Sequence, residues 1–280
     1  MSEAERKVGL SWRERLARWV SRWLATDVQP RPAPRTDFER LSEHLCPADV
    51  VLVEGRSRVA GVIQTVTLSS WSHAALYIGR ADALADGDVR RVVLDAGWPP
   101  DTQVLLEAEM GDGVRVSPLS RYRGEHLRIC RPRDLTERDR VSVITYACAR
   151  YGTPYDMRQI LDLLRFFLPY GILPRHWRSS LFEAGHGDMI RAICSTLLAN
   201  AFASVHYPIL PTIHRGENGE MVFVRRNGRL ITPRDFDYSP YFDIIKYPFF
   251  GDDVARYRDL TWDDDAPRAS RPARGRRSMK

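Results

Sequence analysis

Short apolar segments recur between residues 50 and 131, and they constrain the fold of this chain more than any other feature. In several of these segments, apolar residues alternate with polar ones, as expected where strand side chains point to two opposite faces. We expect strands at 50–53, 72–78, 91–95, 104–109, 114–117 and 126–131. Strands this closely spaced favour antiparallel pairing, because parallel strands need longer crossovers.

Helical patterns surround this block of strands. We expect helices at 37–44, 57–67, 135–150 and 188–204, and another from Pro154 to about Phe167. A closing hairpin is predicted from 221–224 and 229–232, because Asn227-Gly228 is typical of a two-residue hairpin turn. Segregated strands and helices of this kind predict an α+β fold, with helices packed on an antiparallel sheet or barrel.

The 280 residues suffice for one large domain or two small ones. We divide the chain into an N-terminal segment at 1–36, a folded domain at 37–250 and an arginine-rich tail at 251–280 that we expect to be disordered. No stretch is long and apolar enough to span a bilayer, and no secretory signal is visible. A cytoplasmic protein is therefore expected.

Residues 10–25 have the pattern of an amphipathic helix. Its apolar face carries Trp12, Leu16, Trp19, Val20 and Trp23, and its basic face carries Arg15, Arg18 and Arg22. Such a stripe either docks on its own domain or lies at a membrane surface, which would place the protein peripherally at the membrane. The proline-rich residues 28–36 that follow predict a stiff linker.

The formal net charge is +6, and arginine supplies nearly all of the basic residues. A basic surface tolerates anionic partners such as lipid headgroups or nucleic acid. The arginines are scattered, however, their densest group lies in the tail, and no nucleic-acid readout motif is present. No nucleic-acid partner is expected.

The four cysteines are Cys46, Cys130, Cys148 and Cys194. Their spacings fit no zinc or iron–sulfur pattern, and they are sparse for a disulfide scaffold. We therefore expect neither a metal nor an organic cofactor, and we expect most of these thiols to be small buried apolar residues.

Cys194 stands on the apolar face of the helix predicted at 188–204. Periodicity alone favours inert core packing as the explanation of a cysteine there. The glycines before Asp188 nevertheless set the helix start close to Cys194, where backbone N–H groups and the helix dipole stabilise a thiolate. Those N–H groups could also hold the oxyanion of a tetrahedral intermediate, and Ser195 is a small polar neighbour that suits a cleft.

His73 opens the strand predicted at 72–78. Alternation puts His73, Ala75 and Tyr77 on one face, and the small alanine leaves room for a partner side chain. A histidine here is either structural or the base of a cysteine hydrolase, which takes the thiol proton and later delivers it to the leaving group.

Glu107 and Glu109 share one face of the strand predicted at 104–109. A carboxylate bonded to the far nitrogen of His73 would fix its tautomer and stabilise the imidazolium. Without the cysteine and histidine motifs, solvated strand positions would be the preferred explanation of both glutamates.

Several of these segments together resemble a known family, the YiiX-like, circularly permuted papain-like cysteine hydrolases of bacteria, relatives of the NlpC-type peptidases. The matching segments are Pro47 to Val53, Ser72 to Gly79, Leu106 to Ala108, Gly113 to Val116 with Pro118-Leu119, Gly152 to Asp156, and Ile193 to Ser195 with Ala199 and Phe202. They occur in the family's order between residues 45 and 205, and the permutation explains why histidine precedes cysteine.

The resemblance implies a papain-like fold in which Cys194 is the nucleophile, His73 the base and Glu107 the third member. Glu109 is an alternative third member, and so is His126, since related permuted acyltransferases use a second histidine. The N-terminal helix, an insertion between residues 168 and 188 and the C-terminal hairpin depart from the family pattern and could shape the substrate cleft.

The expected function is hydrolysis or acyl transfer at an amide, ester or thioester through an acyl-enzyme on Cys194. The substrate would be a small acyl or peptide-like molecule. The alternative is a membrane-surface or lipid-binding module with a non-catalytic Cys194–His73 pair. The tryptophan stripe at 10–25 supports this alternative.

Overall fold

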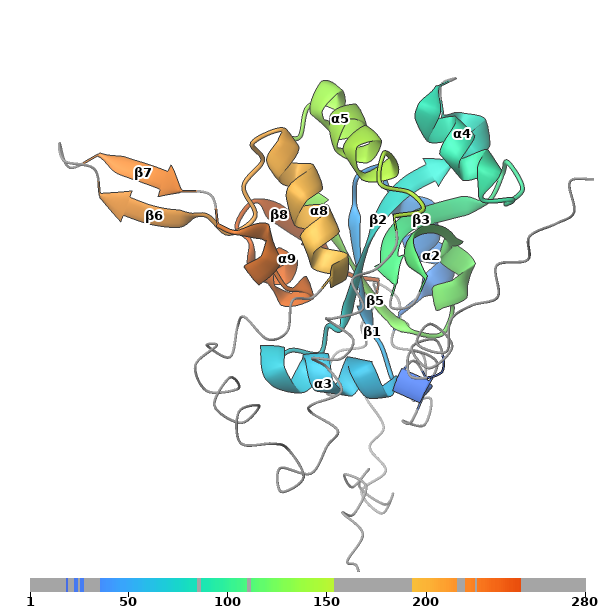
Figure 1. Cartoon of the computed structure of the whole chain (residues 1–280), viewed down its shortest axis with the longest axis horizontal. Coiled ribbons are helices and arrows are strands. Elements are labelled where there is room, and N and C mark those ends of the chain that lie inside the picture. Colours follow the sequence, from blue (N-terminus) through green and yellow to red (C-terminus); the bar gives the residue numbers. More distant parts are fainter. Residues whose placement is uncertain are drawn as a thin grey trace, which may run out of the picture.

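The computed structural model describes residues 19, 23–24, 26–27, 36–84, 87–109, 112–153, 193–215, 220–224 and 226–247. A six-stranded antiparallel sheet forms its centre, in the order β4-β3-β2-β1-β5-β8 (Figure 1). Its strands are β1 (Val50–Glu54), β2 (His73–Arg80), β3 (Gln103–Glu109), β4 (Gly113–Pro118), β5 (His126–Pro132) and β8 (Phe242–Ile245). The predicted α+β fold is confirmed.

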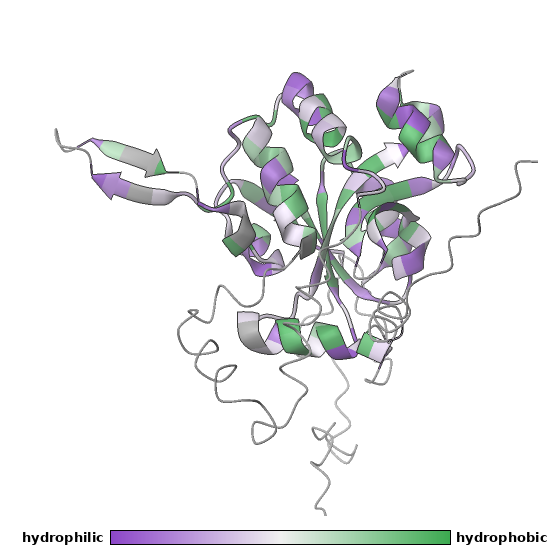
Figure 2. Ribbon diagram, in the orientation of Figure 1, coloured by the Kyte–Doolittle hydropathy of each residue, from purple (hydrophilic) through white to green (hydrophobic). Residues whose placement is uncertain are grey.

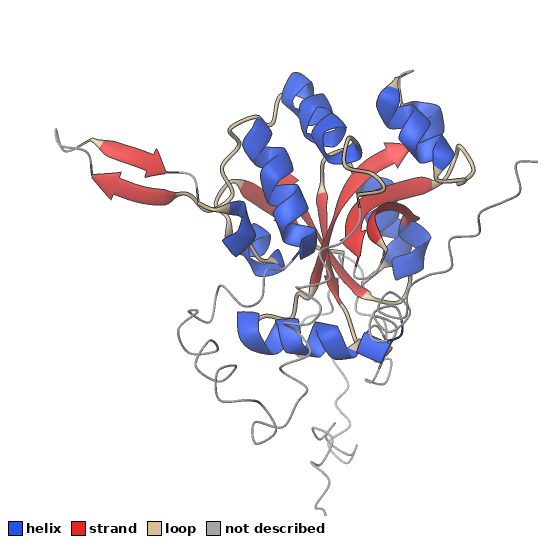
Figure 3. Ribbon diagram, in the orientation of Figure 1, coloured by secondary structure: helices blue, strands red, loops and turns tan. Residues whose placement is uncertain are grey.

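The helices lie around this sheet (Figure 3). They are α2 (Phe38–His44), α3 (Arg58–Thr67), α4 (Asp88–Asp95), α5 (Glu137–Cys148), α8 (Ile193–Ser204) and α9 (Pro233–Tyr238). Three 3-10 turns, η1 (Ala81–Ala83), η2 (Leu119–Tyr122) and η4 (Gly228–Leu230), and a hairpin of β6 (Thr212–Arg215) and β7 (Met221–Val224) complete the described elements. The hairpin projects from the body of the molecule (Figure 1).

Strand alternation divides the core into two layers. On one face Leu52, Leu76 and Leu106 pack with apolar residues of α4, α5, α8 and α9. On the other face Val51 and Leu105 pack with α2 and η2. Hydrophobic residues accordingly run along the central strands, while the outer helices carry mixed colours (Figure 2). Because β1 and β2 are covered on both faces, they read as nearly continuous apolar runs.

The strand predicted at 91–95 is wrong, since these residues belong to helix α4. Its valines suggested β-structure, but Val89, Val92 and Val93 have the i, i+3, i+4 spacing of a helix face. Val93 is fully buried and the other two pack against the same core. Asp88 in the first turn favours the positive end of the helix dipole.

The predicted closing hairpin is also wrong in its second strand. Residues 221–224 form β7, but β7 pairs with β6, which was not predicted. The Asn227-Gly228 dipeptide instead begins η4, where Leu230 N–H donates to the carbonyl of Asn227 at 2.9 Å. Gly228 approaches α8 closely, because a Cβ there would stand 2.8 Å from the Asn200 side-chain oxygen. The glycine thus serves helix packing rather than a hairpin turn.

Only fragments of the N-terminal segment are described. The Trp23 ring lies under the guanidinium of Arg58 at 4.8 Å, and Asp27 bridges to Ser57, so these fragments contact the start of α3. Trp19 is 65% exposed. The rest of the helix predicted at 10–25, the linker before Thr36, the helix predicted from Pro154, the insertion and the tail lie outside the described residues.

Candidate active site

The segment that enters β2 is fixed by a set of local hydrogen bonds. Ser72 Oγ accepts the Gly55 N–H at 2.9 Å, and the Gln64 side-chain amide donates to the carbonyls of Gly55 and Ser70 at 3.0 and 2.9 Å. The buried Trp71 donates its indole N–H to Asp237 at 3.1 Å. These hydrogen bonds fix the backbone just before His73, which is the first residue of β2.

The His73 ring reaches across to β3, where its Nε2 lies 2.7 Å from Oε2 of Glu107. The β2–β3 register, extended by one residue beyond Leu76 and Leu106, sets Ala75 beside Glu107, so His73 contacts a diagonal neighbour. Because the Ala75 side chain is small, the His73 ring has space to reach Glu107. His73 is 21% exposed, whereas Glu107 is fully buried. The structure therefore joins the two residues that the sequence proposed as base and third member.

Glu107 is surrounded by donors besides His73. The Tyr122 hydroxyl donates to the same Oε2, and the buried Ser117 is also hydrogen-bonded to the carboxylate. Arg121 and Arg115 stand 3.5 and 3.7 Å from Oε1. Burial alone would raise the pKa of Glu107, but the bonds from His73, Ser117 and Tyr122 outweigh it and lower the pKa to about 2. Glu107 is ionised at neutral pH.

The two alternative third members, Glu109 and His126, contact residues other than His73. Glu109 is bound by Arg121 and Arg115 at 2.8 and 2.9 Å, and burial together with the charge of Glu107 raises its pKa. His126 stacks on Trp71 with ring centroids 5.3 Å apart and bonds Thr36 through Nδ1 at 3.0 Å. Of the three candidates, Glu107 is the one hydrogen-bonded to His73.

Cys194 lies in the first described turn of α8 and is 5% exposed. Leu198, Ala201 and Phe202 follow it at helical spacing and are fully buried against the sheet, which sets this side of α8 toward β2 and β3. His73 lies close enough to the thiol to lower its pKa through its charge and a hydrogen bond. Because Nε2 of the ring is engaged by Glu107, Nδ1 is the nitrogen left for the sulfur.

The sulfur and the imidazole shift each other's protonation. Burial alone would raise the pKa of Cys194, but the charge and hydrogen bond of His73, helped by the Ala74 N–H and Ser195, lower it below its usual value. For His73 burial alone would lower the pKa, and Cys194 and Glu107 together raise it well above its usual value. A thiolate–imidazolium pair is the state that this arrangement favours.

The other cysteines have different surroundings. Burial raises the pKa of Cys130 far above its usual range and that of Cys148 to about 12. No described cysteine is in a disulfide. Cys194 is thus distinguished by its histidine neighbour, not by burial.

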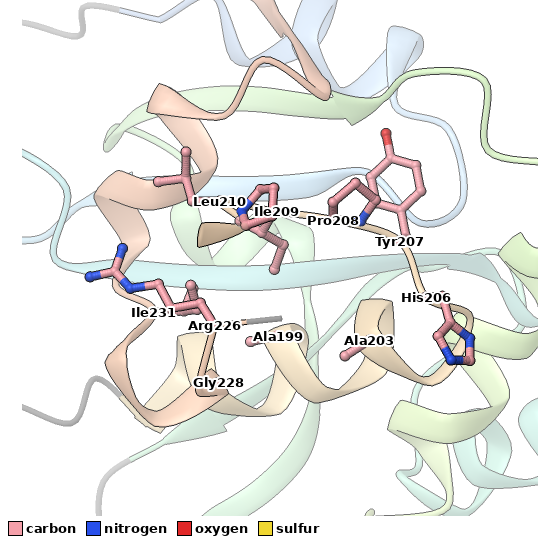
Figure 4. Close-up of a pocket in the computed structure, with 11 residues that line it drawn as sticks. Ala199, Ala203, His206, Tyr207, Pro208, Ile209, Leu210, Arg226, Gly228 and Ile231 are labelled. Atoms are coloured by element: carbon pink, nitrogen blue, oxygen red, sulfur yellow. The ribbon is translucent and has the colours of Figure 1, made fainter. Parts of the chain in front are cut away.

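A cavity of about 280 Å³ lies between α8, the 206–211 loop and η4 (Figure 4). Ala199 and Ala203 form its floor on α8. At 100° per residue, these positions are turned about 140° and about 180° around the helix from Cys194. The cavity therefore opens on the side of α8 opposite the sulfur and is separate from the candidate active site.

Sequence reasoning missed the residues that surround Glu107. Arg115 is directly opposite Glu107 in the β3–β4 pairing, so a correctly registered hairpin would have exposed that ion pair. Tyr122 and Arg121 come from η2, a short 3-10 turn after β4 that has no periodic signal of its own.

A buried thiol on a helix, an imidazole on a strand and a carboxylate on the next strand define a papain-like thiol hydrolase. Residues 44–163 match the family model described as "permuted papain-like amidase enzyme, YaeF/YiiX, C92 family". This match confirms the predicted resemblance to the permuted papain-like family and the prediction of a cysteine hydrolase. The match includes His73 and Glu107 and ends before Cys194.

Among curated proteins, no sequence matches this chain. A solved structure, the metalloprotein yiiX from Escherichia coli O157:H7, is similar at 14% identity and a TM-score of 0.41, covering 77% of this chain and 98% of its own. Within the described ranges of this chain, no group of three or more His, Cys, Asp or Glu residues could hold a metal ion. No described helix is long and apolar enough to cross a membrane.

Proposed function

We propose that Cys194, His73 and Glu107 act together as nucleophile, base and orienting carboxylate in the cleavage of an acyl bond. The observation that carries the proposal is the continuous chain of contacts from the thiol to the His73 ring and from Nε2 to the buried Glu107. The lowered pKa of Cys194 supports a thiolate nucleophile near neutral pH.

The reaction proceeds through an acyl-enzyme. The thiolate attacks the carbonyl carbon and forms an S–C bond, while backbone N–H groups at the start of α8 stabilise the oxyanion. The bond to the leaving nitrogen, oxygen or sulfur then breaks as His73 transfers its proton to that atom. Water gives a proton to His73, attacks the thioester, and releases the carboxylic acid and the thiolate.

An amide is the substrate bond that the family name favours, and we propose a small acyl or peptide-like amide as the substrate. Transfer of the acyl group to another acceptor in place of water would use the same intermediate. Product analysis with and without an added amine separates the two reactions, because transfer yields a new amide in place of the free acid.

The first test is alkylation by iodoacetamide at pH 6, followed by peptide mass spectrometry. We expect Cys194 to be modified, Cys130 and Cys148 to stay unmodified, and Cys194→Ser to abolish the rapid phase. A His73→Gln variant should lose the reactivity at pH 6 because the thiol then loses its cationic neighbour. Labelled Cys46 beside unlabelled Cys194 would contradict the proposal.

The second test detects the intermediate. p-Nitrophenyl acetate should give a burst of nitrophenol and an acetyl adduct on Cys194 that hydroxylamine removes. Cys194→Ser should give neither. An adduct on Cys46 alone would show that the ester reacts with a partly exposed thiol and not at this site.

Membrane contact through residues 10–25 stays a prediction, because most of that segment lies outside the described residues. Vesicle flotation with and without residues 1–30 tests it. Loss of flotation with unchanged Cys194 alkylation would assign membrane binding to the N-terminal segment and catalysis to the domain.

A further inference from the structure

The hydroxyl of Tyr122 and the Nε2 of His73 meet at a single atom, Oε2 of Glu107. Tyr122 comes from η2, and the centroid of its ring lies 6.1 Å from that of the His73 ring, with the two planes inclined by 29°. The phenol therefore contacts the histidine and its carboxylate together.

The opposite oxygen of Glu107 faces two cations. Arg121 and Arg115 stand 3.5 and 3.7 Å from Oε1, and both bind Glu109 more closely, at 2.8 and 2.9 Å. The carboxylate thus lies between an imidazole and a pair of guanidinium groups. A small rotation toward the arginines would strengthen the ion pairs and lengthen the 2.7 Å bond to His73.

We propose that Tyr122 is the positioning residue of this site: its hydroxyl holds Oε2 of Glu107 against His73 and opposes the pull of Arg115 and Arg121. This inference rests on the proposed function, since it concerns the same three residues. Tyr122 acts through Glu107 and touches no reacting atom.

Two further observations agree with this role. Burial and the neighbouring Glu107 raise the pKa of Tyr122 well above its usual value, so the phenol remains a donor across the working pH range. Phenylalanine has the same ring, so Tyr122→Phe removes the hydrogen bond and leaves the stacking on His73 in place.

The test is the pH profile of Cys194 alkylation by iodoacetamide in Tyr122→Phe. Without the hydroxyl, Glu107 turns toward the arginines and His73 loses part of its counter-charge, so the thiolate–imidazolium pair forms over a narrower pH range. We expect the acid-side midpoint to rise by about 0.5 pH unit or more, which is about a threefold loss of thiolate below the midpoint. Tyr238→Phe, at a 64% exposed site on α9, is the matched control and should leave the midpoint in place.

The outcomes separate this inference from the proposed function. A wild-type Cys194 that titrates like an ordinary cysteine overturns both. An acidic wild-type thiol with the same midpoint in Tyr122→Phe, or a lower one, overturns the positioning role alone. A raised midpoint in Tyr122→Phe with no change in Tyr238→Phe supports it.

Should Tyr122→Phe fail to fold, the wild-type protein supplies a second measurement. With tyrosine labelled at the ring carbon that bears the hydroxyl, the Tyr122 NMR signal should shift with the same midpoint as the Cys194–His73 pair, because all are joined through Glu107. A Tyr122 signal that stays constant while the pair titrates would overturn the inference.

Discussion

Nε2 of His73 lies 2.7 Å from the fully buried carboxylate of Glu107, and this hydrogen bond joins strands β2 and β3 at the candidate active site. A neutral amide in place of the carboxylate cannot stabilise the imidazolium and can present an N–H to Nε2 instead. The bond therefore sets both the tautomer and the charge of His73.

Replacing Glu107 by glutamine should lower the rate of ester or amide cleavage by about 100-fold, the low end of what general acid–base catalysis contributes. The measurement is kcat/KM on the same p-nitrophenyl ester. Glu109→Gln is the matched control on the same strand face, and we expect it to cost less than tenfold because Glu109 is bound by the arginines rather than by His73. A larger loss in Glu109→Gln than in Glu107→Gln would reverse the assignment.

The ionisation of Glu107 also contributes to stability. Its folded-state pKa of about 2 lies below the ordinary 4.5, so the stabilisation is complete above pH 4.5 and is lost as the pH falls toward 2. The shift corresponds to about 3 kcal/mol of unfolding free energy. Urea denaturation between pH 2 and 7 should show a steep decline in this window. Glu107→Gln should flatten it, while Glu43→Gln at an exposed position should not.

Alanine substitutions at two glycines near the entry to β2 should change the free energy of unfolding in opposite directions. A Cβ at Gly55 would stand 2.8 Å from Ser72 Oγ and 3.2 Å from Ala60 Cβ, so Gly55→Ala should cost about 1–3 kcal/mol and disturb the residue next to His73. Gly61 lies inside α3 with nothing within 4 Å of its Cβ position, so Gly61→Ala should add about 0.5–1 kcal/mol. Thermal unfolding of both variants checks the signs, and equal signs would contradict the local packing.

The aromatic cluster behind α8 should dominate the stability of its docking. Phe202 is fully buried and packs with its ring centroid 5.3 Å from that of Phe242 on β8 and 6.3 Å from that of Phe236 on α9. Phe202→Ala should cost about 3–5 kcal/mol of unfolding free energy. Tyr238→Ala removes an exposed ring and should cost less than about 1 kcal/mol, so comparable losses in the two variants would argue against this packing.

Much of the fold followed from local patterns in the sequence. Strands β1, β2, β3, β4 and β5 and helices α2, α3 and α5 were predicted from the apolar pattern along the chain. The structure adds that these three helices begin at the capping residues Asp37, Ser57 and Thr136. The valines of α4 misled the prediction because β-branched residues favour strands only when packing agrees. β8 is a four-residue edge strand whose identity depends on its pairing with β5.

The site divides in the same way. His73, Glu107 and Cys194 were predicted from strand alternation, helix position and family resemblance, which operate along the chain. Arg115 lies opposite Glu107 in the β3–β4 pairing, so it could be predicted only once that register is known. Tyr122 could not be predicted, because its importance depends on which atom of Glu107 it faces. No periodic pattern in the sequence indicates that two side chains hydrogen-bond to the same oxygen atom.

The order of the elements along the chain has a consequence for the life of the molecule. The base and its carboxylate lie on strands made early in synthesis, whereas the sulfur lies on α8, which comes later and gains its acidity only after docking beside β2. A complete but unfolded chain therefore carries four ordinary thiols. If Cys194 is the nucleophile, its reactivity therefore arises only when the chain has folded and α8 has docked beside His73.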